Sequence, residues 1–338
     1  MRKEVRSGGL LLTRFLPALL LLAGCAARGA ALVPEEPAPT APLPMESPYL
    51  APSALQEGQI LHLATGRLLS ESELITYLSS FPVVYVGETH DSLDDHAIEL
   101  TVLKGLVERG PQRVALGLEM LQRNSQSEVD AYLSGRMDES GFARTWEKNW
   151  GDDTFRYYRE ILAFARDHEV PVRALNIGMD LREAARDGQT SRENRDLPDM
   201  DLEDPYHKAF IEAILGGHPM EESPNGSPHP SPHQGMEAFY RVQVLWDEAM
   251  AQSAARYLES LEGRGKQLLI LAGGNHVSYG FGIPRRLFRR LPLPYSILLP
   301  FPVGVAIEKG HKVMEVELPE MPMRPADVFW AVGYESLD

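Results

Sequence analysis

Short hydrophobic runs alternate along the chain with longer stretches in which apolar residues recur at helical spacing. The runs at 83–86, 114–118 and 268–272 are continuously apolar and do not alternate with polar residues. Such runs are typical of strands covered on both faces, as in a parallel sheet between two layers of helices. A further strand is expected at 170–175. The pattern therefore predicts an α/β fold with a mostly parallel sheet flanked by helices on both faces.

Smaller elements are expected before and after this sheet. The segments 59–63 and 67–69 suggest a hairpin, and Ser70-x-x-Glu73 is a capping box that opens a helix. After a strand at 295–299, the segments 303–308 and 312–318 predict a hairpin, which forms a small antiparallel C-terminal extension. Helices are expected at 94–109, 125–134, 139–148, 154–168, 205–215 and 236–261, with a short one after Pro284.

One segment interrupts the alternation of strands and helices. Residues 216–235 are dominated by Pro, Gly and Ser, so a solvent-exposed loop between two helices is expected there. His218, His229 and His233 lie within it, and metal binding by these residues is the alternative. Their spacing matches neither a helix nor a tight turn, which favours the loop. The role of this loop stays open.

The N-terminus has the pattern of a signal peptide. A basic start, with Arg2, Lys3 and Arg6, precedes an apolar run at 15–23. This run is shorter than the roughly 20 residues that a transmembrane helix needs. It ends in L-A-G-C at 22–25, which resembles the bacterial lipobox, and acylation of Cys25 would anchor the chain to a membrane. Because Ala26 replaces the Asp common after the cysteine of inner-membrane lipoproteins, the resemblance implies the bacterial outer membrane, with the domain facing the periplasm or the surface.

The expected domains follow from this processing signal. Residues 1–24 are a signal peptide, 25–56 a lipid-anchored linker rich in proline, and 57–338 the folded domain. Removal of residues 1–24 takes away four basic residues and one acidic residue, so the formal charge changes from −15 to −18. This acidic balance argues against a nucleic-acid partner. The single cysteine, Cys25, excludes a disulfide framework and a zinc site built mainly from thiolates.

Polar side chains follow four of the predicted strands. Glu88 and His90 follow the first strand, and Glu119 follows the second. Asn176 ends the third, and the fourth leads into Gly-Gly-Asn275-His276. In an open parallel sheet, ligands bind beyond the carboxyl ends of the strands, so we expect these side chains to line one crevice.

The residue types in this crevice restrict its chemistry. Imidazole and carboxylate donors suit Mn, Zn or Fe, so Glu88, His90, Glu119 and His276 are the candidate metal ligands. A metal there would support hydrolysis by activating water, with the same four residues as the catalytic set. The sequence has no Gly-x-Ser-x-Gly motif, Walker motif or dinucleotide fingerprint, which argues against serine nucleophiles and nucleotide cofactors.

Four motifs together carry a family resemblance. They are G-E-T-H-D at 87–91, L-E-M at 118–120, A-L-N at 174–176 and G-G-N-H-V-S-Y-G-F-G-I-P-R-R at 273–286. In this order they resemble the ChaN branch of the haem-binding uptake, Tiki and erythromycin-esterase-like superfamily, over roughly residues 59–300. ChaN-type proteins are outer-membrane lipoproteins of iron acquisition. The resemblance implies haem bound between two protomers, hence a homodimer, with a tyrosine on the iron and polar contacts to the propionates.

The resemblance leaves the haem-binding residues of this chain open. Tyr158 and Tyr279 are the candidate iron ligands, although each also suits a packing or surface position. His96 is a cofactor contact or a histidine on a helix surface. The four arginines between 285 and 290 contact propionates, or they form a solvated basic face or contact lipid headgroups. Trp246 and Met250 share one helical face and are expected in the core. The expected haem contacts are Tyr158, Tyr279, His96, Asn176, Asn275, Arg285 and Arg286.

Two function classes therefore compete. The first is a lipid-anchored haem-binding protein of iron uptake, which is expected to act by binding and not as an enzyme. The second is a membrane-tethered metallohydrolase, a Tiki-like peptidase or an esterase, with Glu88, His90, Glu119 and His276 at its centre. Both predict the same fold, so the fold cannot separate them.

Overall fold

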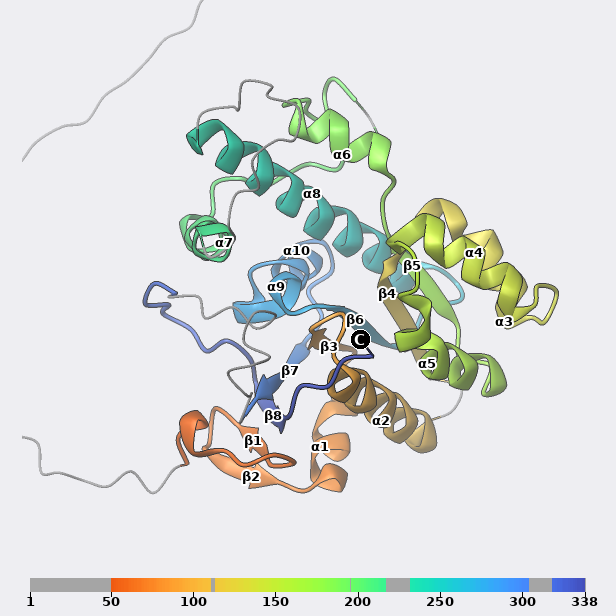
Figure 1. Ribbon diagram of the computed structural model, residues 1–338, viewed down its shortest axis with the longest axis vertical. Coiled ribbons are helices and arrows are strands. Elements are labelled where there is room, and N and C mark those ends of the chain that lie inside the picture. The colour runs from red at the N-terminus through yellow and green to blue at the C-terminus, as the bar shows by residue number, and fades with distance from the viewer. Residues whose placement is uncertain (1–49, 111–112, 195, 217–231, 304–317, 338) are drawn as a thin grey trace, which may run out of the picture. The chain divides into compact units, whose positions relative to one another are not determined.

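The computed structural model describes residues 50–110, 113–194, 196–216, 232–303 and 318–337 (Figure 1). Within them, eight strands form one sheet in the order β2-β1-β8-β7-β3-β6-β4-β5. The strands are β1 Ile60–His62, β2 Arg67–Leu69, β3 Val83–Glu88, β4 Val114–Gln122, β5 Val172–Asn176, β6 Gln267–Gly273, β7 Tyr295–Pro302 and β8 Val328–Val332.

The sheet is parallel from β8 to β5. Strand β3 pairs in parallel with β6 and β7, β4 pairs in parallel with β5 and β6, and β7 pairs in parallel with β8. Antiparallel pairing joins β1 to β2 and to β8. The predicted α/β class is therefore confirmed.

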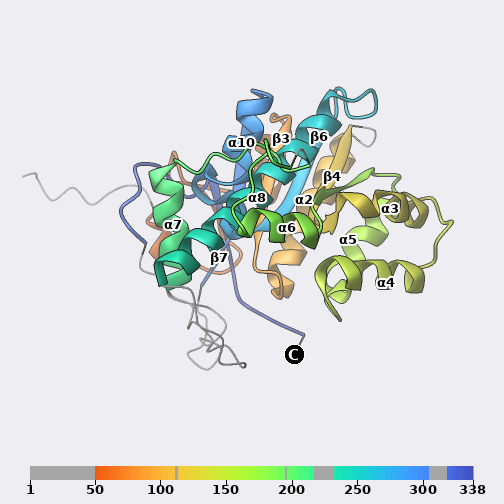
Figure 2. The same ribbon diagram turned by 90° about the horizontal axis from the view of Figure 1, so that it is seen from above.

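Two layers of helices cover this sheet. They are α1 Glu71–Leu78, α2 Leu93–Arg109, α3 Gln126–Leu133, α4 Glu139–Trp150, α5 Phe155–Asp167, α6 Met179–Arg186, α7 Pro205–Gly216, α8 Pro232–Glu259, α9 Gly274–Val277 and α10 Ile283–Arg290, with 3-10 turns at Pro52–Ala54, Arg123–Ser125 and Ser278–Gly280. Figure 1 shows α1, α2 and α5 on one side of the sheet and α8 and α10 on the other. Figures 1 and 2 show α6 and α7 beside α8, against which both pack.

Burial on both faces explains the continuous apolar runs. In β3, Val84 and Val86 face a core shared with α1, α2 and α5. Val83 and Tyr85 point the other way, into a core shared with α8 and α10. Because successive side chains of a strand alternate between faces, a strand covered on both sides needs apolar residues at every position.

Several local predictions are confirmed. Ser70 and Glu73 form the predicted capping box, in which the Ser70 Oγ accepts from the Glu73 N–H at 3.3 Å and Glu73 Oε2 accepts from the Ser70 N–H at 2.9 Å. The N-terminal hairpin is present as β1 and β2. Met250 lies in the core, as expected.

Other elements differ from the predictions or lie outside the described residues. Strand β8 and helix α6 were not predicted, and α8 begins at Pro232, inside the expected loop. The hairpin predicted between 303 and 318 falls largely on residues outside the described ranges, as do the signal segment, Cys25, most of the linker and residues 217–231. Among the helices that the structure describes, none has the length and apolar character needed to cross a membrane.

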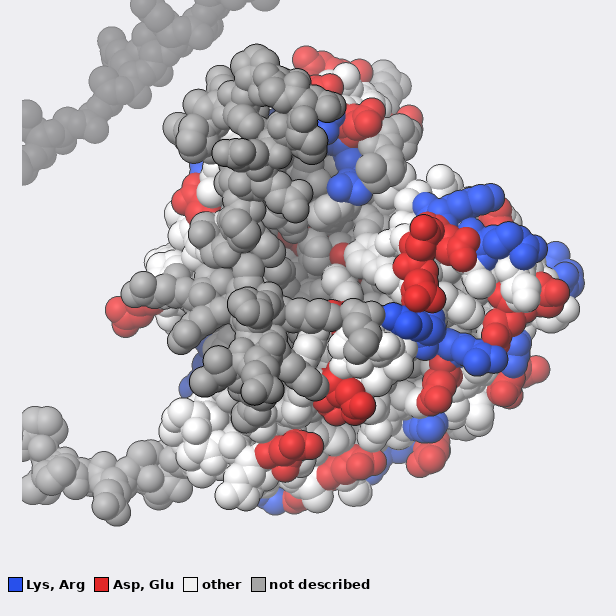
Figure 3. Space-filling model, in the orientation of Figure 1, with Lys and Arg blue, Asp and Glu red and all other residues white. Residues whose placement is uncertain are grey.

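The surface carries charges of both signs. On the face drawn in Figure 3, the region of α3, α4 and α5 shows acidic and basic side chains interspersed. Arg159 and Glu139 form one of these exposed ion pairs, at 2.8 Å. Pairs of this kind contribute little to stability, because water and salt screen them.

Candidate functional site

The four polar strand ends lie side by side, because β3, β6, β4 and β5 are neighbours in the sheet. Glu88 is the last residue of β3, Glu119 lies near the end of β4, and Asn176 ends β5. His276 lies on α9, directly after β6. All four are buried. The structure thus brings together the side chains that the sequence placed in one crevice.

The crevice has two halves, one around Glu88 and His90 and the other around Glu119 and His276, and they meet at Gly273. A Cβ added at this glycine would lie 3.0 Å from His90 Nε2 and 3.6 Å from Glu119 Oε2. The Gly273 N–H donates to the same Glu119 oxygen at 2.7 Å. His90 and Glu119 therefore approach one another across a backbone position where a Cβ would press on the His90 ring.

The first half of the crevice is a buried carboxylate with two donors. Glu88 Oε1 accepts a hydrogen bond from His90 Nδ1 at 2.6 Å and another from the Tyr158 hydroxyl. Burial and the adjacent Glu88 raise the pKa of Tyr158 well above its usual value. Burial alone would lower the pKa of His90, but the hydrogen bond to Glu88 raises it. Since 40% of the His90 side chain is exposed, this imidazole is open to solvent, with Trp150 4.9 Å away.

The second half is an imidazole between two carboxylates. His276 Nδ1 lies 2.7 Å from Asp247 Oδ1, and Nε2 lies 3.3 Å from Glu119 Oε1. Burial alone would lower the pKa of His276, but the charges of Glu119 and Asp247 raise it well above its usual value. Burial opposes ionisation of Glu119, yet His276 holds the pKa of this carboxyl below its usual value. The two carboxylates therefore favour the protonated form of His276.

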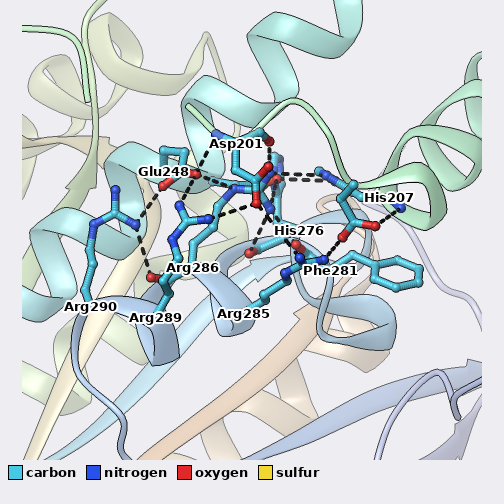
Figure 4. A network of polar contacts seen from close by, with 12 residues as sticks. Asp201, His207, Glu248, His276, Phe281, Arg285, Arg286, Arg289 and Arg290 are labelled. Carbon is cyan, nitrogen blue, oxygen red and sulfur yellow. Dashed lines mark hydrogen bonds and ion pairs between the residues drawn. The ribbon is translucent and has the colours of Figure 1, made fainter. Parts of the chain in front are cut away.

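A buried polar network supports this second half from behind (Figure 4). Arg286, on α10, is 2% exposed and pairs with Glu248 at 3.2 Å. It also donates to the backbone carbonyl of Phe281 and to His207 Nδ1. Burial lowers the pKa of His207 to about 4, so this ring is neutral. The network fixes the position of α8, which carries Asp247.

Sequence reasoning missed three residues of this network, Asp247, Glu248 and His207. Asp247 and Glu248 are adjacent acidic residues on the buried side of α8, and they are 1% and 0% exposed. The only clue in the sequence is an acidic pair within the mostly apolar stretch V-L-W-D-E-A-M. Nothing in the spacing reveals His207, which reaches the network from α7.

The basic helix is solvated only in part. Arg286 is buried, whereas Arg285 and Arg289 are 48% and 43% exposed, and all three neighbours of Arg286 form ion pairs with acidic residues of other segments. Figure 4 shows these arginines directed toward Asp201 and Glu248. The pairs are Arg285 with Asp204, Arg289 with Asp201 and Glu248, and Arg290 with Glu248.

The expected haem contacts divide into a buried and an accessible group. Tyr158, His96 and Arg286 are buried, so the interpretation of His96 as a surface histidine is wrong. Asn176 is also buried, at the end of β5. The accessible group consists of Tyr279, Asn275 and Arg285, which all belong to the segment from α9 to α10.

A small cavity adjoins the crevice at the ends of β4 and β5. Its volume is about 180 Å³, and Trp150 and Trp246 lie on its walls with Arg182 and the amide residues Gln122, Asn149 and Asn176. Trp246 also lies 6.0 Å from the His276 ring. The tryptophan that was expected in the core is thus part of the wall beside the site.

The predicted four-residue metal set stays a prediction. Both ring nitrogens of His276 face carboxylates, and His90 Nδ1 is bonded to Glu88. Of the described residues, Glu88, His96 and Glu99 place one ligand atom each within 4.8 Å of one another.

Comparisons with known proteins identify a family and a fold. A model of the family described as haem-binding uptake, Tiki superfamily, ChaN matches residues 74–287. A solved structure of cofacial heme binding to ChaN of Campylobacter jejuni is 16% identical, with a TM-score of 0.60, and covers 81% of this chain and 98% of that chain.

Two further solved structures match less well. The type III effector HopBA1 is 14% identical, covers 79% of this chain and 94% of its own, and has a TM-score of 0.48. An erythromycin esterase mutant in its open conformation is 15% identical and has a TM-score of 0.41. The match covers 72% of this chain and 76% of that chain. None of the curated protein sequences matches this chain. At 16% identity, the ChaN structure indicates a shared fold alone.

Proposed function

Because the chain belongs to the haem-binding uptake, Tiki superfamily, ChaN family, we propose that it is a lipid-anchored haem-binding protein of iron or haem acquisition. The observation that carries this proposal is the range of the family match. Residues 74–287 contain every strand end that lines the crevice, from Glu88 to His276.

The size of the cavity bears on where haem binds. At about 180 Å³ it is smaller than the roughly 300–1,000 Å³ that enclose small ligands. A haem group therefore cannot be enclosed in this cavity by one chain. This supports binding at an open surface beside the crevice, covered by a second copy of the protein.

The tyrosine that fits iron ligation best is Tyr279. The Tyr158 hydroxyl donates a hydrogen bond to Glu88. Iron ligation would require this hydroxyl to lose its proton, which would leave a phenolate beside a buried carboxylate. Tyr279 is partly exposed and stacks on Phe281, with ring centroids 5.4 Å apart. Haem, when bound, supplies ferric iron, which a tyrosine oxygen can ligate.

Tyr279 belongs to an aromatic cluster of which only part is accessible. Tyr206 is 46% exposed and lies parallel to Phe281 at 6.5 Å, whereas Phe281 and Phe210 are buried beneath the two tyrosines. The accessible rings of Tyr206 and Tyr279 are the ones that can pack against the flat apolar face of a porphyrin. Tyr206, which the sequence did not single out, is the second candidate ligand.

Polar partners for the propionates lie on the same segment. Arg285 has 48% of its side chain exposed and pairs through one nitrogen with the buried carboxylate of Asp204. The exposed part of a guanidinium can donate to a propionate while this ion pair remains. Asn275, which is exposed one residue before His276, adds an amide donor.

The test is a haemin titration of the full chain purified in detergent, followed by absorption spectroscopy. We expect a saturable spectrum and a loss of affinity of at least about tenfold in Tyr279→Phe. Tyr77→Phe, on α1 in the opposite layer, is the matched control and should bind as the wild type does. A loss of haemin affinity in Tyr206→Phe but not in Tyr279→Phe would assign iron ligation to Tyr206 on α7. A titration of the wild type that shows no saturation would contradict haem binding.

The anchor has its own test. We propose that acylated Cys25 holds the chain at the outer membrane, with residues 25–56 as the spacer, because L-A-G-C follows a short apolar run. Cells fed a labelled fatty acid should label the chain, and the Cys25→Ser variant should not be labelled or sediment with membranes. Equal labelling of both would contradict the proposal.

A second candidate function is hydrolysis by Glu88, His90, Glu119 and His276. The observation that favours it concerns His90. Its Nδ1–H donates to Glu88, so Nε2 of the neutral ring carries a lone pair and faces the space beside Gly273. This is the geometry of a general base held by a carboxylate. Bound Mn or Zn with peptide or ester hydrolysis, and no saturable haem spectrum, would favour this function.

A further inference from the structure

A second polar cluster lies behind the crevice, at the start of α2. The two oxygens of Glu88 face different neighbours. Oε1 accepts from His90 and Tyr158, whereas Oε2 is buried and has no hydrogen-bond partner. Glu99 resembles it, because its Oε1 is also buried without a partner, while its Oε2 lies at hydrogen-bond distance, 2.8 Å, from His96 Nδ1. The side chains of Glu88 and Glu99 are both 0% exposed.

The ring of His96 is oriented toward these two carboxylates. Its Nε2 lies 3.1 Å from the backbone carbonyl oxygen of His90, which can only accept, so Nε2 carries the proton. In the neutral ring, Nδ1 is then the nitrogen with the lone pair. This Nδ1 lies 2.8 Å from Glu99 Oε2 and 3.8 Å from Glu88 Oε2.

Three electron-rich side chains thus converge at a buried place. One ligand atom from each of Glu88, His96 and Glu99 lies within 4.8 Å of the others. In the described part of the chain, neither glutamate pairs with a lysine or an arginine. Asp95, a third buried carboxyl, already accepts hydrogen bonds from Thr89 and Ser92. Uncompensated charge of this kind is costly to bury, so either a proton or a cation must be held between these groups.

We propose that Glu88, His96 and Glu99 bind a divalent cation of the Zn, Mn or Fe type. One imidazole and two carboxylates are the donors that these ions accept. The hydrogen bond from Nε2 to a backbone carbonyl is the support that orients metal-binding histidines in proteins. Ligand bonds of about 2.0–2.2 Å require the donors to close in from their present separation. The side chains of Glu99 and His96 can do so from one helix, three residues apart.

This site differs from the crevice and is independent of haem binding. Only Glu88 belongs to both, through its two oxygens. A cation at Oε2 would fix the charge of Glu88, and with it the hydrogen bonds that Oε1 accepts from His90 and Tyr158. The ion is thereby a structural support for the crevice and lies out of contact with its ligand.

The test uses the untagged full chain, freed of metal with a chelator and titrated with Zn²⁺ and with Mn²⁺. Metal content after dialysis should reach about one equivalent of the preferred ion per chain. Glu99→Gln, which keeps the shape and removes the charge, should weaken binding by about 100-fold. Glu108→Gln, at an exposed position of the same helix, is the matched control and should bind as the wild type does.

The same experiment distinguishes a cation from a shared proton. If the two carboxyls share a proton, the wild-type chain will take up no metal at this site, and the proposal fails. Full binding by Glu99→Gln would place the metal elsewhere, as on His218, His229 or His233, and would also overturn it. If Glu99→Gln does not fold, His96→Asn and the absorption bands of Co²⁺ bound to the wild type provide the test, because a nitrogen ligand lost in the variant shifts them.

Haem binding serves as an independent measurement on the same samples. The metal-free chain should still give the saturable haemin spectrum if the proposed function holds, because no ligand of this site reaches the surface. Failure of haem binding with retained metal would contradict the function alone.

Discussion

Asp247 and His276 form a buried hydrogen bond, with 2.7 Å between Oδ1 and Nδ1, that ties the middle of α8 to the end of β6. The bond fixes the ring so that Nε2 faces Glu119, 3.3 Å away. A carboxylate behind a histidine selects its tautomer and orientation, as in catalytic and metal-binding pairs. Asp247 is therefore a positioning residue for the crevice.

Replacement of Asp247 by Asn should destabilise the protein by about 2 kcal/mol, because the charged hydrogen bond to His276 is lost in a buried site. The free energy of unfolding from urea denaturation at pH 7 measures this. Asp152→Asn, at an exposed position, should change it by less than about 0.5 kcal/mol. Equal values for both variants would show that the Asp247 bond contributes nothing.

The pH dependence of stability should contain a contribution from His276. Its pKa in the folded state lies well above the value of about 6.5 in an unfolded chain, so folding favours the protonated ring. The stabilisation is complete below about pH 6.5 and declines as the pH rises toward the folded pKa. The difference in Tm between the wild type and His276→Gln should therefore be smaller at pH 9 than at pH 6.

His168→Gln, at an exposed position at the C-terminal end of α5, controls for the general effect of replacing a histidine by glutamine. A His276→Gln difference that grows with pH would contradict the assigned sign.

Gly273→Ala should displace His90. The new Cβ would lie 3.0 Å from His90 Nε2, which is tighter than ordinary contact, and the ring must move aside. We expect a loss of about 1 kcal/mol and a shifted NMR signal of the His90 ring. Gly274→Ala is the adjacent control, since its Cβ meets only the Glu88 carbonyl oxygen at 3.8 Å. An unchanged His90 signal in Gly273→Ala would contradict this close approach.

Arg286→Lys should be a severe substitution despite the conserved charge. The guanidinium pairs with Glu248 and donates to the Phe281 carbonyl, and a single ammonium cannot make all these bonds at once. A loss of about 2–3 kcal/mol is expected from thermal or urea unfolding. Arg264→Lys at the exposed turn before β6 should be neutral, and equal stability of both variants would show that Arg286 acts through its charge alone.

Ser70→Ala should destabilise α1 by about 1 kcal/mol, because the Ser70 Oγ accepts the Glu73 N–H at the start of the helix. Ser72→Ala, two residues later on the exposed side of the same helix, should have no such effect. Urea denaturation of the two variants measures the difference. A loss in Ser72→Ala as large as in Ser70→Ala would assign it to general helix effects.

Features that depend on neighbours in the chain could be predicted. The capping box at Ser70 and the hairpin at 60–69 follow from residues a few positions apart. The parallel sheet follows from apolar runs, and the convergence of Glu88, Glu119 and His276 follows from the rule that ligands bind beyond the carboxyl ends of parallel strands. Strand β8 escaped prediction because its apolar run is short and lies far from its partners β1 and β7.

The sequence by itself determined the α/β class, the strand-end crevice and the residue types in it, because hydrophobic pattern and strand polarity act locally. Only the tertiary structure decided which partner each residue has. Asp247 reaches His276 across 29 positions, Arg286 is buried against Glu248, and His96 points inward to Glu88 and Glu99. Spacing along the chain does not encode these contacts, because the packing of α2, α8 and α10 against the sheet selects which face of each helix is buried.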